Sequence, residues 1–489
     1  MAYLRKVIEF WNTVKQSKIT KKINQIISSP LGVAILGILT VLAFVHALEA
    51  EFYTFVVIYA IYVALFADDL APLMPLFVLC YITPSKNNNP GTTTGGLFYG
   101  SSGVYLIVIV SIAVLAMILR IVFDKEMGLR RLFTKKRMLL PSMLILGASY
   151  LLSGILHPQY AEYAKSNLIF ASIQFASVFL LYFIFSATVK WERFNFDYYA
   201  AFGLIMGLVV CAEVCYSYLF DNIIIDSSID RYLLQTGWGC YNNIGAIIAM
   251  AIPFAFYFAS RKKRNALFLA VACFMFVCVI FTNSRGAISC AVYGFVLPFI
   301  YTFIKCENKR EFRFASLGLL VLLVVGALIC RERLLEIFKN VPNIIDFNPD
   351  SIVINDSGRL EYYADGIQVF LRNPIFGQSF YPIEYELYTF ATVSEFISFF
   401  PPRWHNTPIQ MMASCGIVGI AAYLYHRFMT IKLYCKHFHK NNHFLFFSAS
   451  TLVALSLLDC HFFNVGPTFF YSMTFAVAEF ALAPQKNTI

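Results

Sequence analysis

Long apolar runs separated by short polar connections dominate the chain. Runs long enough to cross a bilayer as helices, about 17 to 25 residues, fall at 31–48, 103–123, 138–156, 168–188, 198–220, 241–259, 265–281, 287–304, 314–330, 407–425, 444–461 and 466–483. Two shorter runs, 52–66 and 71–83, raise the expected number of spans from 12 to 14. Because the runs lack the alternating pattern of a membrane barrel, they predict an all-α, polytopic transmembrane helical bundle.

The composition supports a membrane protein. The chain is 59% hydrophobic and 13% charged, whereas soluble domains carry about twice that charged fraction. The first thirty residues are lysine-rich and lack the apolar core of a cleavable signal peptide. The 12 cysteines lie mostly inside apolar runs without a CxxC pair, which indicates small buried side chains rather than disulfides or a metal site.

The positive charge is distributed as a topology signal. Alternate connections hold 28 of the 38 lysines and arginines, and the intervening connections hold the other ten. By the positive-inside rule, both termini are then cytoplasmic and the stretch 331–406 lies outside. The net charge of +10 is scattered over separate short loops, so no nucleic-acid partner is expected.

The predicted organisation is one membrane-embedded domain over 31–483. Cytoplasmic tails at 1–30 and 484–489 flank it, and 331–406 forms its one large extracytoplasmic loop. The chain contains no GxxxxGK[ST], HExxH or GxSxG motif. ATP-driven transport, a zinc-protease site and a serine nucleophile elbow are therefore not indicated.

A polar break at Thr282-Asn283-Ser284-Arg285-Gly286 separates two spans on the predicted outer side. One interpretation is a tight hairpin whose arginine snorkels to the interface. The other is that Arg285, held at the bilayer surface, pairs with phosphate, for which the guanidinium fork is suited.

A second candidate lies in the outer loop, where Ser357-Gly358 would cap an amphipathic helix that opens with Arg359. This helix is expected to run to Leu371 and to stop at Asn373-Pro374. Taken alone, Arg359 is more simply interpreted as a solvated or salt-bridged residue. Only its occurrence together with the other candidate residues favours a functional role.

The third candidate is His405, which follows Arg403-Trp404 and precedes Asn406 at the entry to a span. A lone histidine at a span boundary is more often structural. A neutral imidazole outside the cell can, however, take a proton from a sugar hydroxyl.

Ionisable residues within the later predicted spans include Glu213, Asp459 and His461. Intramembrane ionisable groups are functional hypotheses by default. Asp459 and His461 lie at the outer end of their span and could line the same external cavity as His405, whereas Glu213 is deeper and can be buried as the neutral acid.

Several of these motifs follow one another in a set order in the second half of the chain, from Asn242 onward. They are a Ser-Arg-Gly at a span end, a Gly-Arg that opens an outer-loop helix, an Asn-Pro-Ile-Phe-Gly turn at 373–377, and His405-Asn406 followed after nine residues by Gly416 and Gly419. In this order they resemble the O-antigen ligase/polymerase family of bacterial membrane glycosyltransferases.

The resemblance implies a glycosyltransferase C-like fold in the bacterial cytoplasmic membrane, with an extracytoplasmic active face. Its implied partners are an undecaprenyl-pyrophosphate-linked glycan donor, a glycan or glycolipid acceptor, and membrane lipids. It implies no metal, nucleotide sugar or other cofactor.

Carried over to this chain, the resemblance implies that Arg285 and Arg359 contact the donor pyrophosphate. His405 would activate or position the acceptor hydroxyl, and Asn406 would orient His405. Gly416 and Gly419 would allow close packing. The remaining candidates for substrate binding are Ser284, Arg403, Trp404 and Asp459.

Other functions stay open at this stage. Ligase and polymerase share the same donor, and the sequence does not separate them. A transporter of polyprenyl-linked glycans or anions would favour charged mid-bilayer residues and two related halves, which are not evident here. A structural or assembly protein with an external loop is a further alternative.

Overall fold

The computed structural model describes residues 13–46, 48–82, 115, 118, 120, 137–156, 161–220, 224–225, 228–229, 234–236, 239–261, 264–329, 345–348, 351–354, 359–380, 404–439 and 442–480. Arg403, the predicted cap at Ser357-Gly358 and nearly all of the predicted span 103–123 lie outside these residues.

Helices carry the fold, as predicted. They are α2 (Lys18–Ile27), α3 (Pro30–His46), α4 (Glu49–Phe66), α5 (Met74–Ile82), α9 (Leu140–Leu156), α10 (Ala161–Phe175), α11 (Leu181–Thr188), α12 (Phe196–Phe220), α13 (Tyr241–Ala259), α14 (Asn265–Phe281), α15 (Arg285–Lys305), α16 (Lys309–Ile329), α18 (Arg359–Arg372), α20 (Thr407–His437), α21 (His443–Leu458) and α22 (Val465–Phe480). A π-helical segment, Ala176–Leu180, connects α10 to α11.

Three short antiparallel hairpins accompany the helices. They pair β1 (Ile224–Ile225) with β2 (Ser228–Ile229), β3 (Gln235–Thr236) with β4 (Gly239–Cys240), and β5 (Ile345–Asn348) with β6 (Ser351–Ile354). The first two lie between α12 and α13, and the third lies in the predicted outer loop.

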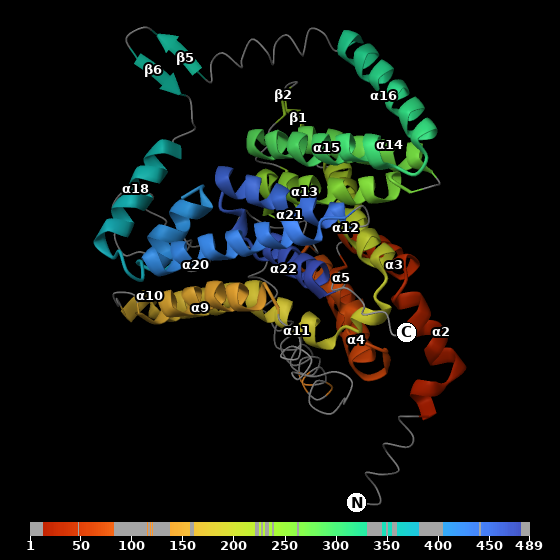
Figure 1. Cartoon of the computed structure of the whole chain (residues 1–489), viewed down its shortest axis with the longest axis horizontal. Helices are drawn as coiled ribbons and strands as arrows, with labels where there is room; N and C mark the ends of the chain where they lie inside the picture. The colour runs from red at the N-terminus through yellow and green to blue at the C-terminus, as the bar shows by residue number, and fades with distance from the viewer. Residues whose placement is uncertain are drawn as a thin grey trace, which may run out of the picture.

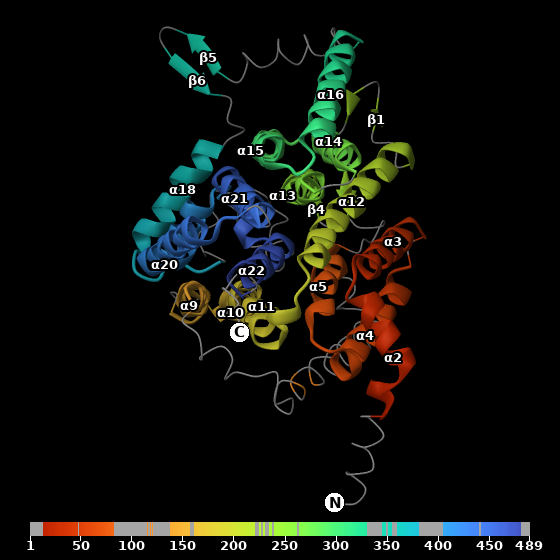
Figure 2. The same cartoon turned by 45° about the vertical axis from the view of Figure 1, so that its right-hand side comes forward.

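Helix α13 lies at the centre of the bundle, among α12, α14, α15 and α21 (Figure 2). Small residues allow its neighbours to approach closely. A Cβ added at Gly245 would lie 2.5 Å from the Ala287 Cβ of α15, and one added at Gly207 would lie 2.5 Å from the Ala251 Cβ of α13. Such small-residue contacts are typical of membrane helix packing.

The number of candidate spans differs from the prediction. In the described part of the chain, five helices are long and apolar enough to cross a membrane, with a sixth if the bent pair α2–α3 counts as one span. Four further apolar helices have 10–17 residues, and α5 has nine. A polytopic helical membrane protein is confirmed. Several of the apolar runs form helices that are shorter than a bilayer crossing requires. The expected number of 12 to 14 spans stays a prediction.

Helix ends that were predicted to share one side of the membrane do lie together. The starts of α13, α15 and α20 meet the end of α21, as the contacts of Asn242, Ser284 and Asp459 show. At the opposite end of α13, Arg261 pairs with Asp197 at the start of α12 over 3.3 Å. These contacts agree with the sides that the alternation of lysine and arginine assigns to the helix ends, while the orientation in the membrane stays a prediction.

Helix α20 extends beyond its predicted end at 425, and Arg427 is correspondingly not in a loop. The helix continues to His437. The Arg427 guanidinium carbon lies 4.8 Å from the centre of the Tyr423 ring and 4.9 Å from that of Phe462. Stacking on aromatic faces stabilises the cation within the bundle, which a count of charges along the sequence does not reveal.

A break at Gly416 divides α20. Gly416 has φ 64° and ψ −157°, a region open essentially to glycine. A loop after α18 fills the break: Ile417 N donates to Pro374 O over 2.7 Å, and Gln378 N donates to Ala413 O over 2.9 Å. A Cβ at Gly416 would lie 2.4 Å from Ile375 O. The close approach predicted for this glycine is thus made by a loop.

Candidate functional site

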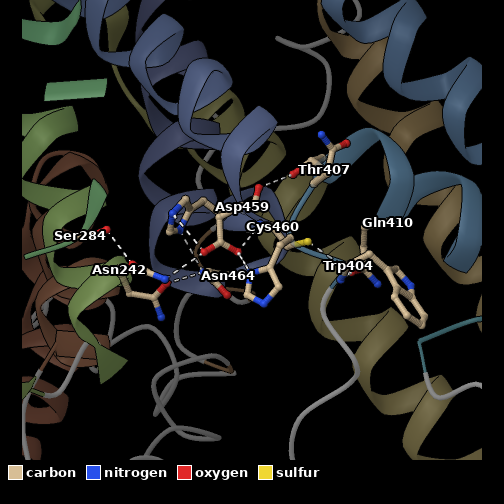
Figure 3. Close-up of polar contacts among 12 residues, drawn as sticks. Asn242, Ser284, Trp404, Thr407, Gln410, Asp459, Cys460 and Asn464 are labelled. Atoms are coloured by element: carbon tan, nitrogen blue, oxygen red, sulfur yellow. Dashed lines mark hydrogen bonds and ion pairs between the residues drawn. The ribbon is translucent and has the colours of Figure 1, made fainter. Parts of the chain in front are cut away.

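Two helix starts and one helix end converge on a polar cluster (Figure 3). The helix starts are those of α15, preceded by Ser284, and α20, preceded by His405 and Asn406. The helix end is that of α21, where Asp459 follows Leu458 in the connection to the 3-10 turn η6 (His461–Phe463). Asp459 therefore lies beyond its helix and not within a span.

The imidazole of His405 is hydrogen-bonded to Asp459, with Nδ1 3.1 Å from Oδ1. The Asp459 carboxyl also accepts from Cys460 N over 2.6 Å, and its Oδ2 lies 4.0 Å from His461 Nε2. Burial opposes ionisation, but the hydrogen bond with His405 and the charge of His461 outweigh it, and the pKa of Asp459 lies below its usual value. An ionised carboxylate only accepts hydrogen bonds, so Nδ1 carries a proton, and in the neutral form of the imidazole the lone pair is then on Nε2.

Local backbone geometry places His405. Its φ of 48° is in the left-handed region, which costs a residue with a Cβ roughly 1 to 3 kcal/mol and persists only where the surrounding structure imposes it. Asn406 caps α20 by accepting from Ile409 N over 3.1 Å, and its Nδ2 donates to Leu457 O over 2.9 Å. We expected Asn406 to orient the imidazole; in the structure Asp459 makes that contact and Asn406 anchors the backbone.

The start of α15 is tied to the same carboxylate. Ser284 caps α15 by accepting from Ala287 N over 3.3 Å, and its Oγ donates to Asn242 Oδ1 over 2.6 Å. Asn242 Nδ2 in turn lies 3.4 Å from Asp459 Oδ2. Arg285 follows the cap as the first residue of α15; its side chain is exposed and has no hydrogen-bond or ion-pair partner among the described residues.

Helix α18, which opens with Arg359, contacts His405, and α18 and α20 lie side by side at one end of the bundle (Figures 1 and 2). The Tyr362 ring centre lies 5.3 Å from that of His405, and Tyr363 OH donates to His405 O over 3.4 Å. Residues three and four apart share a helix face, so Arg359 lies on the face that contacts His405. Within the described residues, its guanidinium has no hydrogen-bond or ion-pair partner.

Trp404 has a packing position. Its side chain is only 4% exposed. A Cβ added to Gly366 of α18 would lie 3.1 Å from Trp404 Cγ, so the indole lies directly under that helix. Trp404 N donates to Gln410 Oε1 over 3.0 Å, and Cys460 Sγ donates to the same oxygen over 3.3 Å. Trp404 thus supports the loop that carries His405.

The structure unites most of the predicted site residues and adds others. His405, Asp459 and Ser284 belong to one hydrogen-bonded cluster, Arg285 and Arg359 start the helices beside it, and Arg403 lies outside the described residues. The sequence reading missed Asn242, which connects two of these elements. An asparagine at the outer end of a span, opposite other polar span ends, was the signal that could have indicated it.

Among the described residues, no group of three or more His, Cys, Asp or Glu side chains is arranged so that it could hold a metal ion. The cysteines whose side chains the structure describes form no disulfide with one another. Glu213 lies in α12, fully buried, away from the contacts of this cluster.

The described helices include several candidate membrane spans, and the polar cluster places His405 and Asp459 near the starts of the helices that open with Arg285 and Arg359. Residues 269–424 match the family model described as O-antigen ligase, which supports the assignment of the chain to the O-antigen ligase family. The match agrees with the predicted resemblance in the part of the chain that it covers, and it supports a membrane glycosyltransferase-like ligase or polymerase role. No curated protein matches the chain.

Proposed function

We propose that the chain transfers a glycan from an undecaprenyl-pyrophosphate donor to a hydroxyl of a glycan or glycolipid acceptor at the outer face of the bacterial cytoplasmic membrane. The family match supports the class of reaction. The observation that carries the proposal is the hydrogen bond between His405 Nδ1 and Asp459 Oδ1 over 3.1 Å, at the entry to α20 and beside the start of α15.

His405 is the proposed base. Because Asp459 holds the proton on Nδ1, Nε2 can accept the proton of the acceptor hydroxyl as its oxygen attacks the anomeric carbon. The Asp459 carboxylate then stabilises the imidazolium that forms. Tyr362, whose ring contacts the imidazole, limits the orientations that the ring can take.

Arg285 and Arg359 are the proposed partners of the leaving pyrophosphate. The bond from the anomeric carbon to the pyrophosphate oxygen breaks, its electron pair passes to that oxygen, and the bond to the acceptor oxygen forms. The two guanidiniums have no partner among the described side chains. They would therefore bind the pyrophosphate more strongly in the transition state, where its negative charge grows, than in the ground state. No carboxylate pair stands out as nucleophile and acid in the sequence or among the described residues of the cluster, so we propose a single displacement with inversion.

Reconstitution tests the proposal. The purified chain in proteoliposomes, supplied with a lipid-linked glycan donor, should form a new glycosidic bond to an added acceptor, and His405→Ala should lower the rate at least about 100-fold. Supplying a glycolipid core in one reaction and a second lipid-linked glycan in another separates ligase from polymerase.

Two results would contradict the proposal. One is full transfer by stably folded His405→Ala and Arg285→Ala proteins. The other is passage of the donor glycan across the bilayer without a new glycosidic bond, which would indicate a transporter instead.

A further inference from the structure

Asn242 lies between Ser284 and Asp459 in the proposed site (Figure 3). Its Oδ1 accepts from Ser284 Oγ over 2.6 Å, and its Nδ2 donates toward Asp459 Oδ2 over 3.4 Å. The amide orientation follows from chemistry, because an ionised carboxylate can only accept and the amide nitrogen must therefore face it. Asn242 thus links the residue that precedes Arg285 to the residue that holds His405.

Close packing next to Asn242 restricts the movement of the start of α15 relative to α13. One turn further along α13, a Cβ on Gly245 would lie 2.5 Å from Ala287 Cβ and 2.9 Å from Thr282 Oγ1. The start of α15 is therefore in direct contact with α13. Ser284 is 3% exposed, so its hydroxyl depends on a protein partner rather than on bulk water.

We propose that Asn242 is a positioning residue that sets the placement of Arg285 relative to His405. The proposal rests on the proposed glycan transfer. Ser284 and Arg285 are consecutive, so a shift of the cap shifts the guanidinium with it. A displacement of about 1 Å far from the reacting atoms can lower a rate roughly 100-fold.

The variants Asn242→Ala and Asn242→Asp test the link in the proteoliposome assay, with Ser289→Ala as control. Ser289 is exposed and donates only within α15, to Arg285 O over 3.0 Å. We expect Asn242→Ala to lower kcat by about tenfold or more, as for loss of a hydrogen bond to a charged group, with a smaller change in the donor KM. Ser289→Ala should keep the wild-type kcat.

Asn242→Asp distinguishes positioning from general stability. At neutral pH the new carboxylate faces Asp459 and repels it, whereas at lower pH the two can share a proton and restore the hydrogen bond. The kcat of Asn242→Asp relative to wild type should therefore rise as pH falls, and this variant, nearly isosteric with wild type, remains informative if Asn242→Ala does not fold.

The positioning role would be overturned if both variants kept the wild-type kcat, or if Asn242→Asp lost the same fraction of kcat at every pH. The proposed glycan transfer would still stand in that case, provided that His405→Ala strongly lowers the transfer rate. If wild-type protein forms no glycosidic bond, the proposed function fails and the positioning role fails with it.

An independent observation concerns the amphipathic helix α2. It joins α3 at an angle of 71°. Its buried side contains Asn24, whose Nδ2 donates to Phe66 O over 2.9 Å and whose Oδ1 accepts from Tyr62 OH over 3.2 Å. Helix α2 is thus fixed to α4 at the edge of the molecule (Figures 1 and 2).

The rest of α2 divides into an apolar stripe and a basic face. Ile19, Ile23 and Ile26 are 74%, 38% and 37% exposed, and their spacing of four and three places them on one side. Three exposed lysines occupy the adjoining surface, from a position beside the stripe to the side opposite it, and none pairs with an acidic residue in the described ranges: Lys22, Lys18 and Lys21.

We infer that α2 lies in the plane of the bilayer surface and binds anionic phospholipid. If α3 crosses the membrane, a bend of 71° lays α2 almost parallel to the surface. The isoleucines then enter the acyl boundary and the lysines meet phosphate headgroups, the arrangement typical of interfacial helices. Each lysine near an anionic surface adds about 1 kcal/mol of attraction, which is roughly fivefold in affinity.

Photocrosslinking tests this orientation. A benzophenone amino acid replaces Ile23 in one full-length protein and Gln25, on the basic side, in another. In vesicles of phosphatidylethanolamine and phosphatidylglycerol, we expect lipid adducts at position 23 and few at position 25. Adducts with phosphatidylglycerol should fall severalfold when Lys18, Lys21 and Lys22 are changed to glutamine.

Adducts between position 23 and a second copy of the chain would overturn the inference, as would equal lipid labelling at positions 23 and 25. Phosphatidylglycerol labelling that is unaffected by the lysine changes would overturn the anionic-lipid preference.

Discussion

The starts of α15 and α20 use the same backbone device but place the reactive side chain differently. In each, a residue in the left-handed region precedes a capping residue: Asn283, with φ 52°, before Ser284, and His405, with φ 48°, before Asn406. Each cap also ties its helix to a neighbour, through Asn242 or through Leu457.

The difference lies in which position carries the chemistry. In α15 the strained residue is an asparagine, a type that tolerates positive φ, and Arg285 follows in relaxed helical geometry. In α20 the strained residue is His405 itself, and its imidazole is held by Asp459. A long, exposed arginine can adapt to a ligand, whereas a base must have a fixed direction. The less favourable backbone conformation is thus found at His405, the residue whose side-chain direction matters most for the proposed reaction.

The largest expected effects come from removing the two reactive side chains. We expect His405→Ala to lower kcat roughly 100- to 10,000-fold, as for loss of a general base. Arg285→Ala should lower it roughly 100- to 1,000-fold, as for loss of one donor to a developing anion, or about 2.7 to 4 kcal/mol. Initial rates of glycan transfer at saturating donor measure both.

Arg285→Lys sharpens this contrast. It keeps the charge but loses the fork that suits phosphate, so an intermediate kcat is expected. A larger loss in Arg285→Ala than in His405→Ala would mean that positioning of the leaving group, and not the base, dominates the rate.

Asp459→Asn should have the next largest effect, because an amide no longer fixes the proton on Nδ1 of His405. By analogy with residues that orient metal-bound histidines, we expect a loss of roughly 10- to 100-fold in kcat. Rates of transfer by folded Asp459→Asn protein measure it, and wild-type rates would contradict the assigned tautomer.

The same carboxyl gives a pH prediction. Because the pKa of Asp459 is lowered in the folded state, ionised Asp459 stabilises the protein above the ordinary carboxyl value of 3.8, and this stabilisation is lost as pH falls below it. Thermal unfolding in detergent should therefore depend less on acidification in Asp459→Asn than in wild type.

Gly416→Ala tests the break in α20. The backbone of Gly416 is open essentially to glycine, and the added Cβ would lie 2.4 Å from Ile375 O. We expect a destabilisation of at least about 1 to 3 kcal/mol, measured by thermal unfolding. Gly318→Ala is the matched control, because a Cβ there meets nothing within 4 Å; equal stability of both variants would show that the loop can be displaced at little cost.

The smallest effects should come from the two caps. Ser284→Ala and Asn406→Ala each remove a cap hydrogen bond, which costs about 1 kcal/mol. Ser284→Ala should also lower kcat, since Arg285 loses its tie to Asn242. Unfolding temperature and kcat, measured on the same preparations, show whether the two starts respond alike.

Much of the fold and part of the site followed from the sequence. The apolar runs predicted membrane helices, and the distribution of lysine and arginine assigned to one side several helix ends that meet in the structure. The helix opened by Arg359 ends at Arg372, next to the Asn373-Pro374 stop. These features depend on local composition and on water and lipid as solvents, so they can be read along the chain.

Contacts between distant segments were decided only by the tertiary structure. The pairing of His405 with Asp459, the link through Asn242 and the loop that fills the break at Gly416 each join residues far apart in sequence. Whether a polar group finds its partner across helices depends on their rotation and depth, and apolar periodicity leaves both undetermined. The reactive residue types were therefore predictable, while the hydrogen bonds that orient them were not.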